Sequence, residues 1–174
     1  MKRLLLLRHA KSERETADDL KRGLEKRGEK DSVRMGRYLR EDAYLPDLVL
    51  CSPSTRTRET LKRVLAELGS APPVQYPSEL YLAEPEIIAS LARRAPEKCG
   101  TLMVVGHNPG LEQCALSLAA AGDDKAQRKR TMAMREKFPT CALAVIDFAV
   151  DRWADVAPGT GELDAFMRPK DLAD

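Results

Sequence analysis

The chain has only two histidines and four cysteines among its 174 residues. The cysteines are scattered with no CxxC spacing, which argues against a zinc site or a disulfide framework. No Walker phosphate-binding pattern occurs, and the glycine pair at Gly159 and Gly161 lacks the third glycine of a dinucleotide motif. We therefore expect reduced thiols in a cytoplasmic protein that uses no metal and no cofactor.

Long apolar runs and a strong charge of either sign are also missing. No run approaches the roughly 20 apolar residues of a membrane span. The leucines at positions 4–7 end at Arg8, short of a signal-peptide core, so we expect neither export nor a membrane partner. With 29 basic and 27 acidic residues, the net charge of +2 gives no argument for nucleic-acid binding. The length and the 43% hydrophobic content predict one folded domain, residues 1–174.

Short apolar runs alternate with amphipathic segments along the chain. The runs predict strands at 4–7, 48–51 and 101–106, and two closing strands at about 141–148 and 152–156. Apolar spacing predicts helices from about Glu29 to Pro46, from Pro53 to Gly69, and around 87–95 and 111–118. This alternation predicts a three-layer α/β/α fold, with a mostly parallel central sheet and helices on both faces.

Each histidine comes directly after a predicted strand. His9 follows Arg8 at the end of the first strand, and His107 follows the strand that ends at Gly106. Arg56 lies on the turn after a third strand. Because open α/β sheets bind ligands at the carboxyl ends of their strands, we expect these side chains to surround one anion, most simply a phosphoryl group.

Phosphoryl transfer without a metal depends on cations that are already in position. Arginine suits this task because its planar guanidinium can bind two phosphate oxygens at once and keeps its charge near neutral pH. Arg22, in the polar loop after the first strand, could complete the set, with Lys21 and Arg27 as alternatives. Such charges lower the pKa of a nearby imidazole, so either histidine could attack phosphorus while the other donates to the phosphoryl oxygens.

Three further features have a structural and a functional interpretation. The helix after Ser52 offers backbone N–H groups at its positive end, where anions bind. Asn108, the only asparagine, is expected to shape the turn and cap the next helix, with a phosphate contact as the alternative. The basic segment 125–137 is either a solvated face or a surface that docks an acidic partner protein.

Several motifs resemble those of the histidine phosphatase superfamily, which includes phosphoglycerate mutases and acid phosphatases. The LLLLRHAKS segment around His9 resembles its Arg-His signature, and the segments from Ser52 to Thr60 and around His107 resemble its second and third motifs. The RGLEKRG loop that begins at Arg22, the FPT segment and the RPKDL segment resemble the SixA-like branch, which removes phosphate from phosphohistidine. The resemblance implies a phosphoglycerate mutase-like fold.

The resemblance also implies roles for individual residues. His9 would be the nucleophile that becomes phosphorylated, His107 would contact the phosphate, and Arg8, Arg22 and Arg56 would hold it. Glu79 is the candidate that protonates the leaving group, although a phosphoramidate can arrive with its nitrogen already protonated.

Two positions depart from the branch pattern. Gly23 stands where the loop usually has proline, and Cys141 stands where the branch tends to have glycine. Neither change removes a reacting group.

These observations predict a metal-independent phosphatase whose phosphohistidine intermediate is hydrolysed by water. The stretch from Arg56 to His107 is too short for a long insertion that would roof the site. An open site suits a phosphohistidine-bearing protein as the substrate. The alternatives are a phosphomonoesterase for a small phosphate ester and a non-catalytic module that binds phosphorylated partners.

Overall fold

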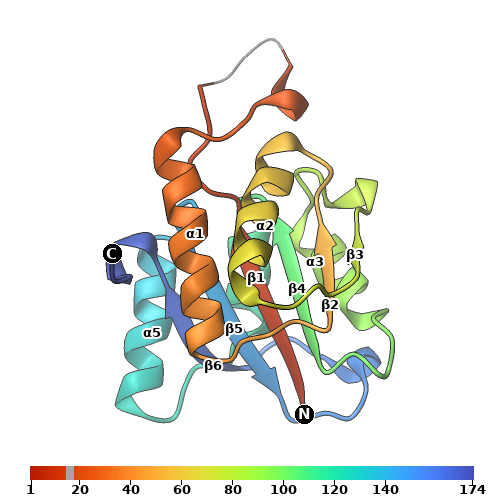
Figure 1. Cartoon of the computed structure of the whole chain (residues 1–174). Coiled ribbons are helices and arrows are strands. Elements are labelled where there is room, and N and C mark those ends of the chain that lie inside the picture. Colours follow the sequence, from red (N-terminus) through yellow and green to blue (C-terminus); the bar gives the residue numbers. More distant parts are fainter. Residues whose placement is uncertain (15–17) are drawn as a thin grey trace.

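The computed structural model describes residues 1–14 and 18–174, and within them six strands form one central sheet in the order β3-β2-β4-β1-β5-β6 (Figure 1). The strands are β1 (Lys2–Arg8), β2 (Leu48–Cys51), β3 (Val74–Gln75), β4 (Thr101–Gly106), β5 (Leu143–Phe148) and β6 (Glu162–Met167). β1 to β4 pair in parallel, whereas β5 pairs antiparallel with both β1 and β6. The predicted α/β fold with a mostly parallel sheet is confirmed.

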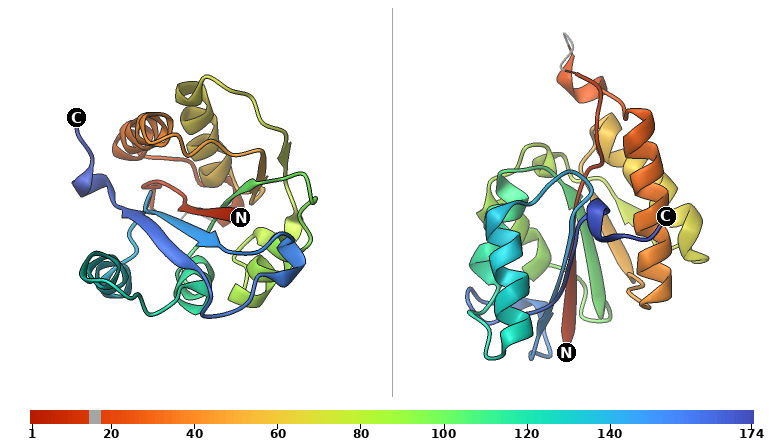
Figure 2. Two further views of the ribbon diagram at one scale, coloured as in Figure 1. Left: turned by 90° about the horizontal axis from the view of Figure 1, so that it is seen from below. Right: turned by 90° about the vertical axis from the view of Figure 1, so that its left-hand side faces the viewer.

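Helices cover both faces of the sheet, as Figure 2 shows in its edge-on view. One face carries α1 (Lys26–Glu41) and α2 (Thr55–Leu68), and the other carries α3 (Pro85–Arg93), α4 (Gly110–Leu118) and α5 (Lys125–Glu136). In the part of the chain that the structure describes, no helix is both long and apolar enough to cross a bilayer.

The alternation of side chains along β1 builds a core on each side of the sheet. Leu5 and Leu7 pack with the helices α1 and α2, while Leu4 and Leu6 pack with α3, α4 and α5. All four leucines are fully buried. A strand covered on both faces reads as a continuous apolar run, which explains why these four leucines follow one another.

The predicted strand at 152–156 is wrong. Trp153–Asp155 forms a short 3-10 turn, and the strand that closes the sheet is β6, further along the chain. The buried Trp153 indole donates a hydrogen bond to the Cys99 carbonyl oxygen over 2.6 Å. The apolar side chains of this segment therefore anchor a loop against the α3–α5 core rather than extend the sheet.

Helix α1 begins at Lys26, before the expected start near Glu29. Gly28, which precedes the expected start, lies in the first turn of the helix. A Cβ atom on Gly28 would lie 2.1 Å from the backbone oxygen of Lys11, so only glycine fits there. This close approach packs the start of α1 against the segment that follows β1.

Candidate active site

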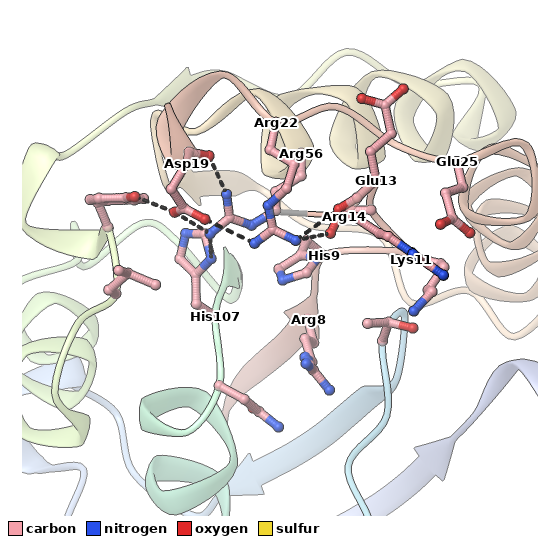
Figure 3. A pocket seen from close by; sticks show the side chains of 15 residues that line it. Arg8, His9, Lys11, Glu13, Arg14, Asp19, Arg22, Glu25, Arg56 and His107 are labelled. Carbon is pink, nitrogen blue, oxygen red and sulfur yellow. Dashed lines mark hydrogen bonds and ion pairs between the residues drawn. The ribbon is translucent and has the colours of Figure 1, made fainter. Parts of the chain in front are cut away.

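The carboxyl ends of β1, β2 and β4 meet at one edge of the sheet and bring both histidines into one pocket (Figure 3). In the parallel pairing of β1 with β4, Arg8 lies opposite Gly106, so the residues that follow the two strands are neighbours. The ring centroids of His9 and His107 are 5.4 Å apart, and the ring planes are inclined by 55°. The two imidazoles therefore converge as the predicted phosphoryl site requires.

His9 is held in one tautomer by the backbone. Its Nδ1 atom lies 2.8 Å from the carbonyl oxygen of Ala10. A carbonyl oxygen only accepts, so Nδ1 carries the proton and Nε2 keeps a lone pair. Burial, against the hydrogen bond to Ala10 and together with the positive charges of Arg8, Arg56 and Arg22, lowers the pKa of His9 to about 4. At neutral pH the ring is thus neutral and keeps its lone pair on Nε2.

His107 is tied to two side chains that come from the β2–α2 segment. Its Nε2 atom lies 2.7 Å from Ser52 Oγ, and its Nδ1 atom lies 3.4 Å from Arg56 Nη2. Arginine only donates, so Nδ1 is the acceptor and Nε2–H donates to Ser52. Burial, together with the charges of His9 and Arg56, lowers the pKa of His107 to about 3. A bound dianion would raise this pKa again.

A second contact between segments fixes the backbone next to His9. Thr60, one turn after Arg56 on α2, donates from Oγ1 to the Arg56 carbonyl oxygen over 2.7 Å. The hydroxyl oxygen of Thr60 in turn accepts a hydrogen bond from the backbone N–H of Ala10 over 2.9 Å. Thr60 therefore ties the residue that orients His9 to the helix that carries Arg56.

Three arginines from three parts of the chain line the pocket. Arg8 ends β1 and donates to the carbonyl oxygen of Phe138 over 3.0 Å, while Arg22 donates to Ser12 Oγ over 2.7 Å. Arg56, only 2% exposed, lies in the first turn of α2. In each of the three, the Nε atom is buried and has no hydrogen-bond partner among the described residues. Because buried donors without a partner are costly, this excess of donors favours an anionic ligand.

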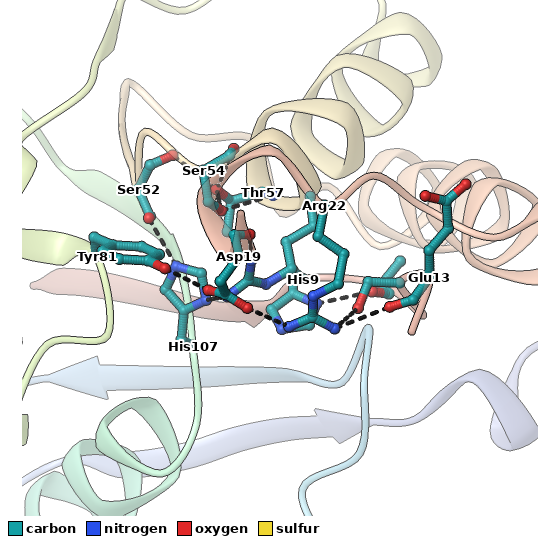
Figure 4. A network of polar contacts seen from close by, with 12 residues as sticks. His9, Glu13, Asp19, Arg22, Ser52, Ser54, Thr57, Tyr81 and His107 are labelled. Atoms are coloured by element: carbon teal, nitrogen blue, oxygen red, sulfur yellow. Dashed lines mark hydrogen bonds and ion pairs between the residues drawn. The ribbon is translucent and has the colours of Figure 1, made fainter. Parts of the chain in front are cut away.

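Asp19 is the main site residue that the sequence analysis missed (Figure 4). Its Oδ1 atom lies 2.9 Å from Arg22 Nη2, and its Oδ2 atom lies 3.1 Å from Arg56 Nη2. The hydrogen bond from Tyr81, followed by those from the two arginines, lowers the pKa of Asp19 to about 2. The chain thus places its own carboxylate on two of the arginines predicted to hold phosphate. The acidic pair at 18–19, three residues before Arg22, was the available sequence signal.

Tyr81 lines the pocket as well. Its hydroxyl donates to Asp19 Oδ2, and its ring meets the His107 ring edge-on, with centroids 5.5 Å apart. The hydrogen bond to the carboxylate raises the pKa of Tyr81. Although the sequence favoured a packing role, the hydroxyl takes part in the polar network of the site.

Asn108 performs the expected structural task. Its Oδ1 atom accepts the backbone N–H of Glu112 in α4 over 3.2 Å, and its Nδ2 atom donates to the Phe138 carbonyl oxygen over 3.0 Å. Arg8 donates to that same carbonyl oxygen. Asn108 also lines the pocket, so a phosphate contact stays a prediction.

Glu79 is not brought to the pocket. Its side chain is 53% exposed and lies 3.7 Å from the guanidinium of Arg94. The proton-donor role implied for Glu79 has no geometric support, because the residue does not line the cavity that holds both histidines.

The pocket has a volume of about 970 Å³ and a mostly positive lining. Its basic residues are Arg8, Lys11, Arg14, Arg22 and Arg56, and its acidic residues are Glu13, Asp19 and Glu25. Residues 15–17, which follow Arg14, lie outside the described residues. Within the described part of the chain, no three histidine, cysteine, aspartate or glutamate side chains form a group that could hold a metal ion. The lining suits an anion larger than a bare phosphate.

Comparison with known proteins gives consistent matches. Residues 4–81 match the model of the histidine phosphatase superfamily (branch 1). An uncharacterized protein of Mycobacterium tuberculosis is 38% identical over 166 residues, which cover 94% of this chain and 100% of that protein. Two solved structures, each 28% identical, carry the provisional name phosphohistidine phosphatase SixA. The one from Agrobacterium tumefaciens has a TM-score of 0.78 and covers 97% of this chain and 98% of its own. The one from Nakamurella multipartitia has a TM-score of 0.81 and covers 97% of this chain and 96% of its own.

Two imidazoles and three arginines line one pocket at the carboxyl edge of the sheet, an arrangement that suits an anionic ligand. Site and fold together support phosphatase activity. The chain belongs to the histidine phosphatase superfamily, in its SixA-like branch.

Proposed function

We propose that this protein is a metal-independent phosphatase that removes phosphate from phosphohistidine on a protein partner, through a phospho-His9 intermediate. The observation that carries the proposal is the state of His9. The Ala10 carbonyl oxygen fixes the proton on Nδ1, the lowered pKa keeps the ring neutral, and His107 lies beside it.

In the first step, the lone pair on His9 Nε2 attacks phosphorus. The bond from phosphorus to the leaving nitrogen breaks, and its electron pair stays on that nitrogen. Arg8, Arg22 and Arg56 stabilise the negative charge on the phosphoryl oxygens. To do so, Arg22 and Arg56 give up their salt bridges with Asp19 and bind the phosphoryl oxygens instead. The ring of His9 becomes a phosphorylated imidazolium, which the hydrogen bond from Nδ1–H to Ala10 stabilises.

In the second step, a water oxygen attacks the phosphoryl group of phospho-His9. The bond from phosphorus to Nε2 breaks, and the electron pair returns to the neutral ring. Both protons of the water leave with the phosphate product. His107 is proposed to contact the phosphoryl oxygens in both steps, because a dianion beside it raises its lowered pKa and favours the form with two N–H donors.

The carboxyl groups of the site favour a phosphoramidate over an ester. An alkyl ester needs an acid to protonate its leaving oxygen. Asp19 is ionised at neutral pH, and Glu79 lies outside the pocket. The imidazole of a phosphohistidine takes a proton from water before the bond breaks, so it leaves as a neutral group without help.

The relatives and the cysteines support the remaining parts of the proposal. The two solved structures named for a phosphohistidine phosphatase cover nearly the whole chain, in line with one domain over residues 1–174. The four cysteines are buried free thiols, which is typical of a cytoplasmic protein.

A small-molecule phosphomonoesterase is the second candidate. The pocket volume of about 970 Å³ lies within the range of small-molecule sites, about 300–1,000 Å³, and so leaves room for a small phosphate ester. The non-catalytic module has less support, because the nucleophile and all three arginines are present.

The two enzymatic candidates can be separated by their substrates. The purified protein is incubated in EDTA with the alkyl ester glycerol 2-phosphate and with a carrier protein phosphorylated on histidine, and the kcat/KM values are compared. We expect turnover without metal and a kcat/KM for the carrier at least about a hundredfold higher, because the ester lacks a proton donor. Equal or better use of the ester would favour the phosphomonoesterase, and binding without turnover of either substrate would favour the module.

A further inference from the structure

A second hollow, of about 950 Å³, lies along α5 on the flank of the molecule. Apart from Met132, Ala133 and Glu136, every residue that lines it is basic. These residues are Lys125, Arg128, Lys129, Arg135, Arg168 and Lys170. The last two come from the C-terminal segment that follows β6.

This hollow is linked to the active-site pocket through shared lining residues. A smaller cavity of about 220 Å³ lies between them, and Thr140 lines both that cavity and the active-site pocket. At its other end, Glu136, Arg168 and Lys170 line both the small cavity and the hollow along α5. We call this continuous surface, from Thr140 to Lys125, the basic trough.

Most charges of the basic trough are available for a partner, although Arg168 forms a salt bridge with Asp171 over 2.8 Å. Lys125, Arg128 and Lys129 are exposed, and none of them forms a salt bridge with a described residue. Met132, 70% exposed, lies one turn after Arg128 and Lys129 on the same side of the helix. The trough thus combines unpaired positive charges with an apolar patch, which is a common composition for a protein-binding surface.

The length of the trough limits what it can bind. Its helical part, α5, has 12 residues and is therefore about 18 Å long. A small phosphate ester that reacts at His9 cannot reach its far end, whereas a protein segment can. From this length and from the charge, we propose that the basic trough binds an acidic segment of the phosphorylated protein substrate and so presents its phosphohistidine to His9.

This inference rests on the proposed function for the identity of the phosphorylated group. It adds the chemical class of the substrate and the surface that selects it. Positive charge alone would also attract nucleic acid or anionic lipid. The connection to the active site and the exposed Met132 favour a protein, and the other two are outcomes of the test below.

The test uses two phosphohistidine peptides of equal length, one with glutamate and one with glutamine at the flanking positions. The variant Lys125→Glu/Lys129→Glu reverses two charges of the trough far from His9. The control Lys30→Glu/Lys62→Glu makes the same change in net charge on exposed lysines of α1 and α2, across the sheet.

We expect the wild type to prefer the acidic peptide by about tenfold in kcat/KM, mainly through KM, and to lose this preference as salt is added. The trough variant should lose the preference and still hydrolyse p-nitrophenyl phosphate at the wild-type rate. The control variant Lys30→Glu/Lys62→Glu should keep the preference for the acidic peptide. An equal preference in the wild type and the trough variant would overturn the inference.

A binding experiment separates this inference from the proposed function. Fluorescence anisotropy measures the affinity for the acidic peptide without its phosphate, so the result does not depend on catalysis. Weaker binding to the trough variant, with unchanged binding to the control, supports the trough even if phosphohistidine is not the substrate. Tighter binding of a single-stranded DNA 20-mer, or of phosphatidylserine vesicles, through the same lysines would overturn the assignment to a protein.

Discussion

The edge of the sheet that carries the histidines and the flank formed by α5 are both rich in cations, but they hold them differently. At the sheet edge, Arg56 is 2% exposed and is bound by Asp19 and His107. On the flank, Lys125 and Lys129 are exposed and form no salt bridge with described residues. Buried, oriented charges suit catalysis, because the transition state needs donors at exact positions. Exposed charges suit the recognition of a partner, in which several residues share the attraction and salt weakens it.

The largest expected effect is at His9. His9→Ala removes the only nucleophile of the mechanism, and we expect kcat to fall by at least about 10⁴-fold, as for other catalytic nucleophiles. Measurement of phosphate release checks this. Binding of inorganic phosphate should persist, because the arginines remain. Full hydrolysis by this variant would show that the mechanism is wrong.

The next largest effect is expected at Arg56, whose planar guanidinium can donate two parallel hydrogen bonds. Arg56→Lys keeps a charge but loses the planar fork, and we expect kcat/KM to fall by about 10²- to 10³-fold. The matched control is Arg58→Lys. Arg58 lies two residues further along α2, and its guanidinium stacks on the ring of Tyr76 outside the pocket. A loss of the same size in both variants would mean that the helix, and not the site, responds to the change.

Protonation of the two histidines should also lower stability. Their pKa values are lowered in the folded protein, so the unfolded chain binds protons first as the pH falls below about 6.5. The free energy of unfolding should therefore drop between pH 7 and pH 5.5, by about 1 kcal/mol for each histidine. Urea denaturation measures this drop. Because the chain has no other histidine, the variant His9→Gln/His107→Gln should show a much weaker dependence in this range.

A smaller effect is expected at Asp19. Its carboxylate competes with phosphate for Arg22 and Arg56, so Asp19→Asn should bind inorganic phosphate about tenfold more tightly. Product inhibition of p-nitrophenyl phosphate hydrolysis gives this affinity, with Asp18→Asn as the neighbouring control. Weaker phosphate binding would indicate instead that Asp19 holds the arginines in the productive position.

The smallest effect is expected at Glu79. Because this side chain lies outside the pocket, Glu79→Gln should change kcat for the alkyl ester glycerol 2-phosphate by less than about twofold. A general acid would contribute about 10²- to 10⁴-fold. A loss of that size would restore the role that the family resemblance implies.

The sequence predicted the elements that bring the catalytic groups together, because their signals are local. The apolar runs before His9 and His107 and the helix after Ser52 are long enough to identify, and parallel pairing then places their ends side by side. Asp19 and Tyr81 could not be placed in this way. Both lie in turns, where no periodicity fixes the direction of a side chain.

Two other positions show what local patterns leave out. The apolar residues Trp153 and Val156 suggested a strand, but they anchor a turn against the core. Cys141, where the branch tends to have glycine, adopts a φ of 62°, and its N–H donates to the His9 carbonyl oxygen over 2.9 Å. This left-handed conformation gives a physical reason for glycine at that position.

The most direct measurement is the chemical identity of the intermediate. The protein is mixed rapidly with a phosphohistidine substrate, quenched in alkali, which preserves phosphohistidine, digested and analysed by mass spectrometry. The account predicts a transient peptide that contains His9 and carries one phosphoryl group on that residue, formed and lost at rates consistent with turnover. Turnover without this species, or with the phosphoryl group on another residue, would contradict the account.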